Sequence, residues 1–221
     1  MERSEENNVA TNIKIKDSDK KVYNFFKRAF DLISSSIALI VFSPIFLIVA
    51  IAIKLDSEGD IVFGHTRIGR DGKLIKVYKF RTMVKNAKEV FENFTEEQKQ
   101  EYYTNFKLDN DPRITRVGNF LRKTSLDELP QLLNIIKGDM SVVGPRPIVE
   151  KEIEKYGVYA KKMFSVTPGL TGYWQANGRS DTSYDERVQM DMYYVDNRSF
   201  LMDMKIIFKT VISVIKKKGA I

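Results

Sequence analysis

The chain has 221 residues, with 43% hydrophobic and 29% charged residues, and carries a formal net charge of +7 at pH 7. This basic balance is compatible with nucleic acid, an anionic membrane surface or a phosphorylated substrate as partner. No cysteine is present, which excludes disulfides, zinc–thiolate sites and cysteine nucleophiles. The single histidine, His65, excludes a multi-histidine metal site.

The N-terminal part of the chain contains its most apolar segment. Residues 1–20 are polar and lack periodicity, and we expect a flexible tail there. Leu32–Ile53 then runs for 22 residues without a charge, which is long enough to cross a bilayer core as a helix. It begins late and no small-residue cleavage site follows it, so it is not a cleavable signal peptide.

A serine–proline pair and two basic flanks complicate a simple membrane span. Pro44 follows Ser43 near the middle of the apolar segment, and proline removes a backbone hydrogen bond and bends a helix. Basic residues stand on both sides: Lys20, Lys21, Lys27 and Arg28 before it, and Lys54, Arg67, Arg70 and Lys73 after it. The positive-inside rule therefore assigns no orientation. The residues leave open a spanning helix with a tolerated proline and a bent, re-entrant helix that enters and leaves by one face.

The remainder predicts an α-rich domain with a small β element. Extended segments are expected over 60–83 around a tight turn at Asp71-Gly72. Helices are expected over 86–106, 116–137, 150–162 and 201–218, and irregular Gly/Pro segments over 109–113, 138–147 and 167–179. Several of these helices combine apolar faces with basic edges, which suits both a membrane interface and ordinary core packing.

Two neighbouring carboxylates, Asp127 and Glu128, lie close to a predicted helix start. Ser125 and Glu128 fit a capping box, which would give the pair a purely structural role. Pro130 opposes that arrangement because it would remove a hydrogen bond inside the helix. With Asp127 as the cap, Pro130 would fall in the first turn, where its missing N–H matters less.

The same carboxylates also suit phosphate chemistry. Consecutive helical residues point in different directions, so only a helix terminus or its lead-in could bring both to one site. Arg122 and Lys123 lie nearby and could neutralise phosphate. An aspartate can attack phosphorus and form an acyl phosphate, while a second carboxylate manages protons or helps to hold a divalent metal.

Two further segments supply candidate phosphate ligands. Pro145 and Pro147 flank Arg146 and fix the backbone on both sides of it, and a rigid guanidinium suits bidentate phosphate binding. Lys79 and Arg81 place two cations beside the hydroxyl of Thr82. Each segment alone would also fit a solvated turn or strand edge.

In this order along the chain, the motifs resemble the bacterial sugar transferase family, the monotopic phosphoglycosyl transferases. The resemblance covers nearly all of residues 27–215. It rests on Lys27-Arg28-Ala29-Phe30-Asp31-Leu32, Ser43-Pro44, Arg67-Ile68-Gly69, Lys79-Phe80-Arg81-Thr82-Met83, Asp111-Pro112-Arg113, Ser125-Leu126-Asp127-Glu128-Leu129-Pro130-Gln131, Gly144-Pro145-Arg146-Pro147, Pro168-Gly169-Leu170-Thr171-Gly172 and Trp174-Gln175. Many relatives carry an extra N-terminal membrane domain, and this chain resembles the short form that has the catalytic part only.

The resemblance implies a site and a topology. Residues 21–56 would form a re-entrant membrane helix broken at Ser43-Pro44, and 57–221 a catalytic domain with interfacial helices on the cytoplasmic face of a bacterial inner membrane. Asp127 would be the nucleophile and a magnesium ligand, and Glu128 an acid or base. The phosphate and nucleotide site would be formed by Lys79, Arg81, Arg122, Pro145, Arg146 and Pro147.

The implied reaction transfers a phosphosugar from a UDP-sugar to polyprenol (undecaprenyl) phosphate through an aspartyl intermediate, with release of UMP. A glycosyltransferase that releases UDP and a non-catalytic membrane scaffold are the rivals. No nucleic-acid module is recognisable, and the sequence names no interface for a homodimer. Asp60 and His65 depart from the residues often seen in relatives, proline and glutamine, and His65 is interpreted as a surface or structural residue.

Overall fold

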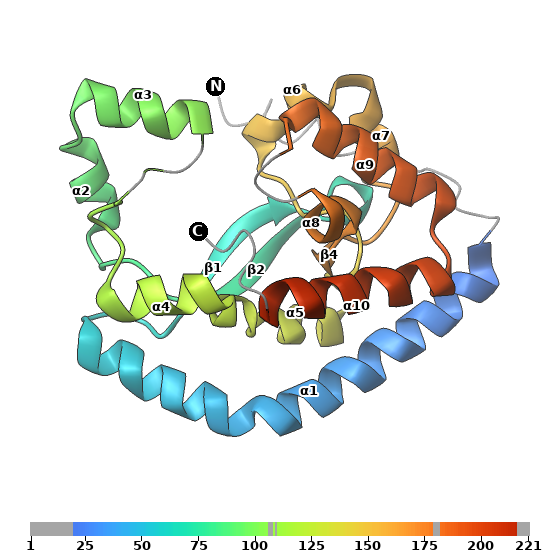
Figure 1. Cartoon of the computed structure of the whole chain (residues 1–221), viewed down its shortest axis with the longest axis horizontal. Helices are drawn as coiled ribbons and strands as arrows, with labels where there is room; N and C mark the ends of the chain where they lie inside the picture. The colour runs from blue at the N-terminus through green and yellow to red at the C-terminus, as the bar shows by residue number, and fades with distance from the viewer. Residues whose placement is uncertain (1–19, 106–107, 109, 179–181, 216–221) are drawn as a thin grey trace, which may run out of the picture.

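The computed structural model describes residues 20–105, 108, 110–178 and 182–215, and within them the chain is rich in helix with two small sheets (Figure 1). The first half consists of α1 (Lys21–Asp56), β1 (Val62–Ile68), the 3₁₀ turn η2 (Arg70–Gly72), β2 (Leu74–Phe80), α2 (Ala87–Glu92), α3 (Glu96–Asn105), α4 (Arg116–Thr124), the 3₁₀ turn η3 (Leu126–Glu128) and α5 (Gln131–Lys137). The second half consists of β3 (Ser141–Val143), η4 (Glu150–Glu152), α6 (Ile153–Tyr156), η5 (Gly157–Tyr159), α7 (Ala160–Met163), β4 (Gly169–Thr171), α8 (Tyr173–Asn177), α9 (Tyr184–Asn197) and α10 (Phe200–Ile215). The expected tail falls almost wholly outside the described residues.

The long helix α1 is bent at its middle and is not interrupted (Figure 1). Pro44 lies inside it and cannot donate to the carbonyl of Ile40, four residues earlier. The hydroxyl of Ser43 donates to that carbonyl instead, at 2.8 Å. The expected break at Ser43-Pro44 is therefore wrong as an interruption, because the serine satisfies the acceptor that the proline leaves.

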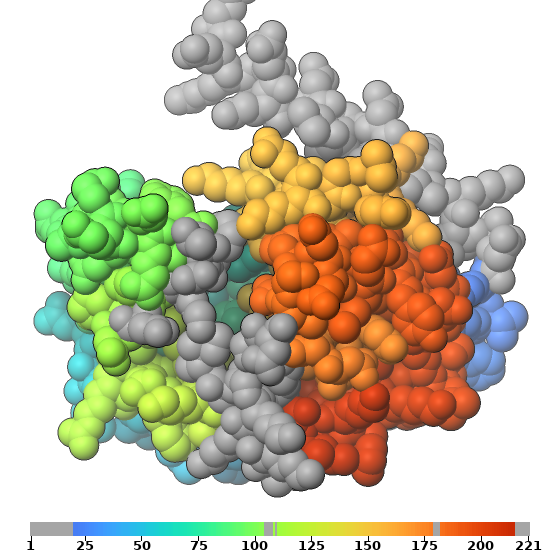
Figure 2. Space-filling view, turned by 45° about the horizontal axis from the view of Figure 1, so that its top comes forward, coloured from blue at the N-terminus to red at the C-terminus, as the bar shows by residue number. Residues whose placement is uncertain are grey.

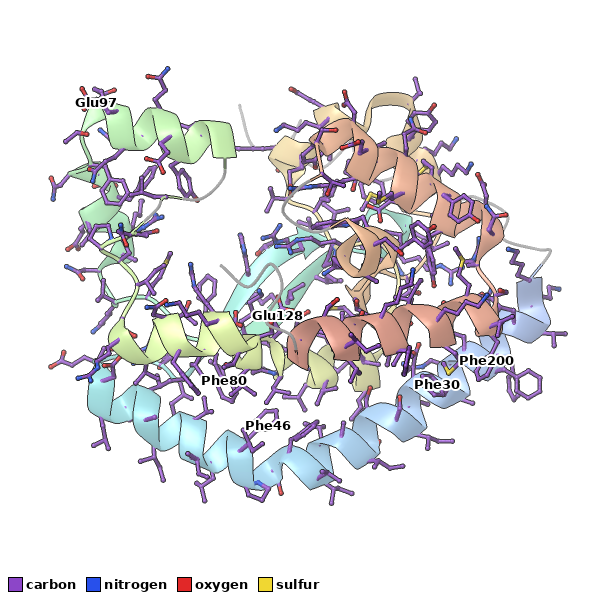
Figure 3. The ribbon with its side chains drawn as sticks, in the orientation of Figure 1. Phe30, Phe46, Phe80, Glu97, Glu128 and Phe200 are labelled. Carbon is purple, nitrogen blue, oxygen red and sulfur yellow. The ribbon has the colours of Figure 1, made fainter. Side chains whose placement is uncertain are left out.

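One side of α1 packs against the rest of the molecule and the other is exposed and apolar. Phe46 packs edge-on against Phe80 at 5.3 Å between ring centroids, and Phe30 against Phe200 at 6.0 Å (Figure 3). Large apolar side chains of α1 remain exposed along its whole length: Val22, Phe25, Phe26, Leu32, Ile33, Ile37, Ile40, Val41, Phe42, Leu47, Ile48, Ile51 and Leu55. Such a continuous apolar surface indicates a membrane or protein contact.

Polar anchors fix both ends of α1 to the remainder of the chain. Near the N-terminal end, Lys27 forms a 2.8 Å ion pair with Asp203, and Asp31 accepts from the backbone N–H of Val142 at 3.0 Å. At the C-terminal end, Asp56 accepts from the backbone N–H of Val117 at 3.1 Å. Both ends of the helix are thereby attached to the same folded domain.

Strands β1 and β2 form the predicted antiparallel hairpin. Asp71 and Gly72 at its turn have φ of 57° and 75°, the left-handed geometry for which an Asp-Gly pair is suited. The free edge of β2 is closed by the fully buried Asn134 of α5, whose amide accepts from the N–H of Tyr78 at 2.9 Å and donates to the carbonyl of Lys76 at 2.7 Å. These two bonds fix α5 beside the hairpin.

The helix expected over 116–137 is wrong as one element, because it divides into α4, η3 and α5. Ser125 adopts a left-handed conformation with φ of 56° and ends α4. Its side chain makes no capping bond, so the capping-box interpretation is wrong, and Asp127 lies within the 3₁₀ turn instead of capping α5. Pro130 is the N-cap of α5, a position that tolerates its missing N–H.

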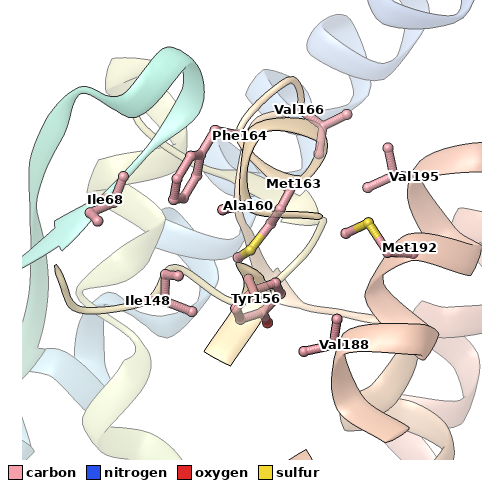
Figure 4. Packing of buried hydrophobic residues seen from close by; sticks show 10 residues of the cluster. All are labelled: Ile68, Ile148, Tyr156, Ala160, Met163, Phe164, Val166, Val188, Met192 and Val195. Atoms are coloured by element: carbon pink, nitrogen blue, oxygen red, sulfur yellow. The ribbon is translucent and has the colours of Figure 1, made fainter. Parts of the chain in front are cut away.

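The C-terminal half packs around a hydrophobic core beneath α9 (Figure 4). The core consists of Ile68, Ile148, Tyr156, Ala160, Met163, Phe164, Val166, Val188, Met192 and Val195. The expected helix over 150–162 is divided among η4, α6, η5 and α7, with Gly157, the first residue of η5, at a φ of 49°. The helix expected over 86–106 forms as α2 and α3, and the expected end of the last helix lies outside the described residues.

Candidate active site

The turn η3 brings both predicted carboxylates to one cation. The Nζ atom of Lys79 lies 2.6 Å from Oε1 of Glu128 and 3.6 Å from Oδ2 of Asp127. Lys79 belongs to β2, against which η3 packs, and Figure 3 places Glu128 beside the hairpin. Consecutive residues of a regular α-helix would point in different directions. Because the turn between α4 and α5 is not a regular α-helix, both carboxylates can reach the same cation.

The environment moves the pKa values of the two carboxyls in opposite directions. Burial raises the pKa of Asp127, with repulsion from Glu128 adding to it and Lys79 and Arg122 opposing it. Burial would also raise the pKa of Glu128, but Lys79 and Arg146 outweigh it and hold that pKa below its usual range. A pair with diverging pKa values suits different roles for its two members.

Two of the predicted arginines face this pair. Arg122 of α4 is oriented by a 3.0 Å bond from Nε to the hydroxyl of Thr82, and burial lowers its pKa. Arg146 lies between two buried prolines, Pro145 and Pro147, after β3. The backbone there is tightly packed, since a Cβ added to Gly144 would lie 2.5 Å from the carbonyl oxygen of Thr167. Arg146 is thereby presented by a rigid loop.

Arg81 occupies a different place from the other predicted cations. Its Nη2 donates to the carbonyls of Ser57 at 2.7 Å and Ile53 at 3.4 Å, so the guanidinium closes the C-terminal end of α1. Gly59 beside it has a φ of 116°, a conformation that favours glycine, and a Cβ there would lie 2.5 Å from Arg81 Nη1. The structure gives Arg81 a structural contact, and its phosphate-binding role stays a prediction.

These groups line a cavity of about 1810 Å³. In Figure 2 the molecule is hollowed between the green segment of α2 and α3 and the orange segment of α8 and α9. Asp127, Glu128, Arg122 and Arg146 lie in one region of its wall with Lys79. Apolar side chains continue the wall toward α1 and α10: Phe42, Leu126, Leu129, Val142, Leu170, Ile207, Val211 and Val214. A polar, cationic part and an apolar part thus share one space.

His65 also lines the cavity, from strand β1. Its ring is exposed, and its Nδ1 atom lies 3.2 Å from an Nη2 of Arg67. Arg67 is further held by Glu152 at 3.4 Å. The interpretation of His65 as a surface residue is compatible with its exposure, but it lies at the site and not remote from it.

Two further groups around the cavity received no role from the sequence. Arg113 forms a buried ion pair with Asp111 at 2.6 Å and lies about 5 Å from the ring centroids of three aromatic residues, Phe91, Phe94 and Tyr102. Arg187 stacks on Trp174 at 4.8 Å. The Asp111-Pro112-Arg113 motif in the sequence pointed to the Arg113 group. The Arg187–Trp174 pair joins residues from α9 and α8 that no local pattern connects.

The donor set suits a magnesium ion only together with a substrate. No group of three or more His, Cys, Asp or Glu side chains arranged to hold a metal occurs among the described residues. Mg²⁺ commonly binds through one or two carboxylates plus substrate phosphates and water, which the Asp127–Glu128 pair could supply. The residues therefore fit a metal that arrives with a phosphorylated ligand, and they do not form a cage of protein ligands.

Comparison with known proteins places the chain in a family. The sequence profile described as "Bacterial sugar transferase" matches residues 22–217. The chain belongs to this family. Within the family it is 49% identical over 197 residues to the exopolysaccharide production protein ExoY of Rhizobium meliloti, an alignment that covers 88% of this chain and 87% of that protein.

Two relatives have names that state their reactions. The undecaprenyl-phosphate galactose phosphotransferase of Salmonella typhimurium is 47% identical over 204 residues, covering 91% of this chain and 43% of that protein. The UDP-glucose:undecaprenyl-phosphate glucose-1-phosphate transferase of Escherichia coli is 41% identical over 207 residues, covering 90% and 42%. The family resemblance and the assignment as a transferase are confirmed.

Proposed function

We propose that this protein transfers a sugar phosphate from a UDP-sugar to undecaprenyl phosphate and so begins the assembly of a surface glycan or glycoconjugate. One observation carries the proposal: two neighbouring carboxylates share Lys79 and face two arginines in a cavity that continues toward an apolar helix. The names of the Salmonella and Escherichia relatives support both substrates.

In the first step, a carboxylate oxygen of Asp127 attacks the phosphorus that bears the sugar. The bond from that phosphorus to the bridging oxygen breaks, UMP leaves, and a phosphosugar ester remains on Asp127. Burial and the raised pKa make the ionised carboxylate of Asp127 a stronger base and a better nucleophile. Arg122 and Arg146 offset the charge that accumulates on the phosphate oxygens.

In the second step, a phosphate oxygen of undecaprenyl phosphate attacks the same phosphorus. The bond to Asp127 breaks, its carboxylate is regenerated, and the product is a polyprenyl diphosphate sugar. Glu128, whose pKa is held low, is ionised near neutral pH and can accept a proton from the incoming phosphate. Bound Mg²⁺, held by Asp127 and substrate oxygens with Glu128 beside it, would supply positive charge to the diphosphate.

The placement of α1 supports a monotopic enzyme on the cytoplasmic face of the inner membrane. Both ends of α1 are anchored to one body through Asp203 and Val117, and its outward side is apolar. A re-entrant helix that leaves the membrane by the face it entered would satisfy both observations. Exposed apolar residues of α10, including Leu201 and Phe208, add a second surface suited to the interface.

Nucleotide release tests the proposed reaction. Purified protein in nanodiscs would receive magnesium, undecaprenyl phosphate and a panel of UDP-sugars. We expect UMP release that depends on the lipid and is reduced at least about 10³-fold in Asp127→Asn, because the nucleophile is lost. Asp185→Asn, an exposed carboxylate of α9, is the control and should retain full activity.

Other products would identify the rivals. Release of UDP in place of UMP would mean simple glycosyl transfer and would remove the nucleophilic role of Asp127. Wild-type rates in Asp127→Asn would contradict the assignment of Asp127 as the nucleophile. Absence of release from every donor in the panel would favour a membrane scaffold.

A further inference from the structure

An exposed aromatic pair lies on the cavity side of strand β1. Phe63 is 56% exposed, and its ring centroid lies 6.0 Å from that of His65, with 43° between the ring planes. Both side chains line the cavity. Exposed aromatic rings within a concave polar site are typical of ligand contacts, because leaving them in water has no structural benefit.

The hydrogen bonding of His65 determines which group it offers to a ligand. Nδ1 lies 3.2 Å from Arg67 Nη2, and a guanidinium can only donate, so Nδ1 accepts and the proton resides on Nε2. Partial burial and the cations Arg67, Lys79 and Arg146 lower the pKa of His65, with Glu152 acting in the opposite direction, which favours the neutral ring. His65 therefore presents one neutral N–H donor beside an aromatic face.

The pair lies next to the reacting carboxylates. Phe63 is the cross-strand partner of Lys79, and Lys79 contacts both Glu128 and Asp127. In a UDP-sugar, the sugar is joined through its anomeric oxygen to the phosphorus that Asp127 would attack. The uracil base is separated from that phosphorus by the ribose and a second phosphate. A surface this close to Asp127 is therefore within reach of the sugar and remote from the base.

We propose that Phe63 and His65 form the subsite for the sugar ring of the donor and contribute to its selection, an inference that rests on the proposed function. The C–H face of a hexose packs on the Phe63 ring, and a hydroxyl accepts from Nε2 of His65. A neutral donor suits a hydroxyl, while the phosphates have Arg122 and Arg146. Epimers that differ in one hydroxyl would then differ in affinity.

Binding to the catalytically silent Asp127→Asn protein tests the subsite without turnover. Calorimetric titration with UDP-glucose, UDP-galactose and UDP separates the sugar from the nucleotide. In this background, we expect His65→Ala to weaken the preferred UDP-hexose about tenfold and to leave UDP unchanged, as the loss of one hydrogen bond predicts. His65→Gln keeps one acceptor and one donor and should restore most of the affinity. Thr66→Ala, an exposed neighbour outside the cavity lining, is the matched control.

Turnover gives the second readout. In the active protein, His65→Ala and Phe63→Ala should change the ratio of kcat/KM between UDP-glucose and UDP-galactose several-fold. Equal losses of affinity for UDP and for both UDP-hexoses would assign the pair to the nucleotide and overturn the proposal. Unchanged binding of the UDP-hexoses in both His65→Ala and Phe63→Ala would overturn it as well. If the reaction proves different, the sugar-dependent difference in binding remains measurable, so the two failures are distinguishable.

Discussion

At the scale of single residues, Lys79 is the group on which the carboxylate pair depends. Its ammonium lies between two acidic side chains that burial would otherwise drive toward their neutral forms. The two carboxylates also repel each other when both are ionised. Lys79 thus favours the ionised carboxylates that the proposed nucleophilic attack and proton acceptance would require.

We predict that Lys79→Met moves the acidic limb of the kcat/KM profile to higher pH by about one unit. With the ammonium removed, burial and mutual repulsion raise the pKa values of Asp127 and Glu128, so more alkaline solution is needed to ionise them. Lys79→Arg keeps the charge and should retain the wild-type profile. Profiles of wild type and Lys79→Met that differ only in height would contradict this role.

The sequence predicted the position of the carboxylate pair better than the contacts that support it. Asp127 and Glu128 were predictable because adjacent carboxylates beside a basic residue and a proline form a local pattern. Arg81 was grouped with Lys79 from the same pattern, yet β2 ends at Phe80 and Arg81, just beyond it, contacts the end of α1. The approach of His65 to the site depends on the packing of η3 against the hairpin, a contact that no local pattern encodes.

At the scale of elements, helix α9 carries a buried carboxyl that destabilises the fold at high pH. Asp191 is fully buried, and Tyr156 donates to its Oδ2 at 2.7 Å. Burial raises the pKa of Asp191 to about 7, although Tyr156 and Arg146 act in the opposite direction. Because the folded-state pKa exceeds the ordinary 3.8, the folded state binds the proton more tightly, and stability is lost as the pH rises toward and through 7.

We predict that Asp191→Asn stabilises the protein at pH 8 and has much less effect at pH 5. The full pKa difference corresponds to at most about 4 kcal/mol, which would raise Tm by several degrees. Thermal unfolding of wild type and variant in the same detergent at both pH values measures it. Asp185→Asn, on the exposed side of α9, should leave Tm unchanged at both. An equal change in Tm at pH 5 and pH 8 would exclude the titration of Asp191.

The bend of α1 also has a local cause. Pro44 leaves the carbonyl of Ile40 without a backbone donor, and Ser43 supplies a hydroxyl in its place.

We predict that Pro44→Ala restores the backbone bond, straightens α1 and favours a true membrane span. A thiol-specific reagent applied to a cysteine placed in residues 1–20 would detect the change of side. Labelling from the cytoplasmic side alone, in variant and parent alike, would refute it; Ile48→Ala is the control because it restores no backbone bond.

The elements differ in how far local sequence specifies them. The hairpin follows from Asp71-Gly72, whose residue types suit left-handed backbone. The division of 116–137 does not follow from local sequence in the same way, because Ser125 adopts left-handed geometry although it is not a glycine. Asn134 likewise looked like an ordinary helical residue, and its bonds to β2 exist only once α5 lies beside the hairpin.

At the scale of the whole molecule, the anchors of α1 constrain its path through a bilayer. A straight helix of 36 residues would be about 54 Å long and would place its ends on opposite sides of the membrane. The bonds of Lys27 with Asp203 and of Asp56 with Val117 could not then form together with one domain. Breaking either would leave a buried charge or backbone group without its partner, which is costly.

We therefore predict that both ends of α1 face the cytoplasm. The chain has no cysteine, so Lys21→Cys and Glu58→Cys each introduce a single thiol at an exposed position beside one end of the helix. An impermeant maleimide should label both variants in inside-out membrane vesicles and neither in intact spheroplasts. Labelling of only one variant in spheroplasts would establish a spanning helix and would separate one set of anchors from the catalytic domain. The active site would then need a different explanation for its access to a lipid acceptor, because the bend at Pro44 would no longer return the chain to the face that bears Asp127.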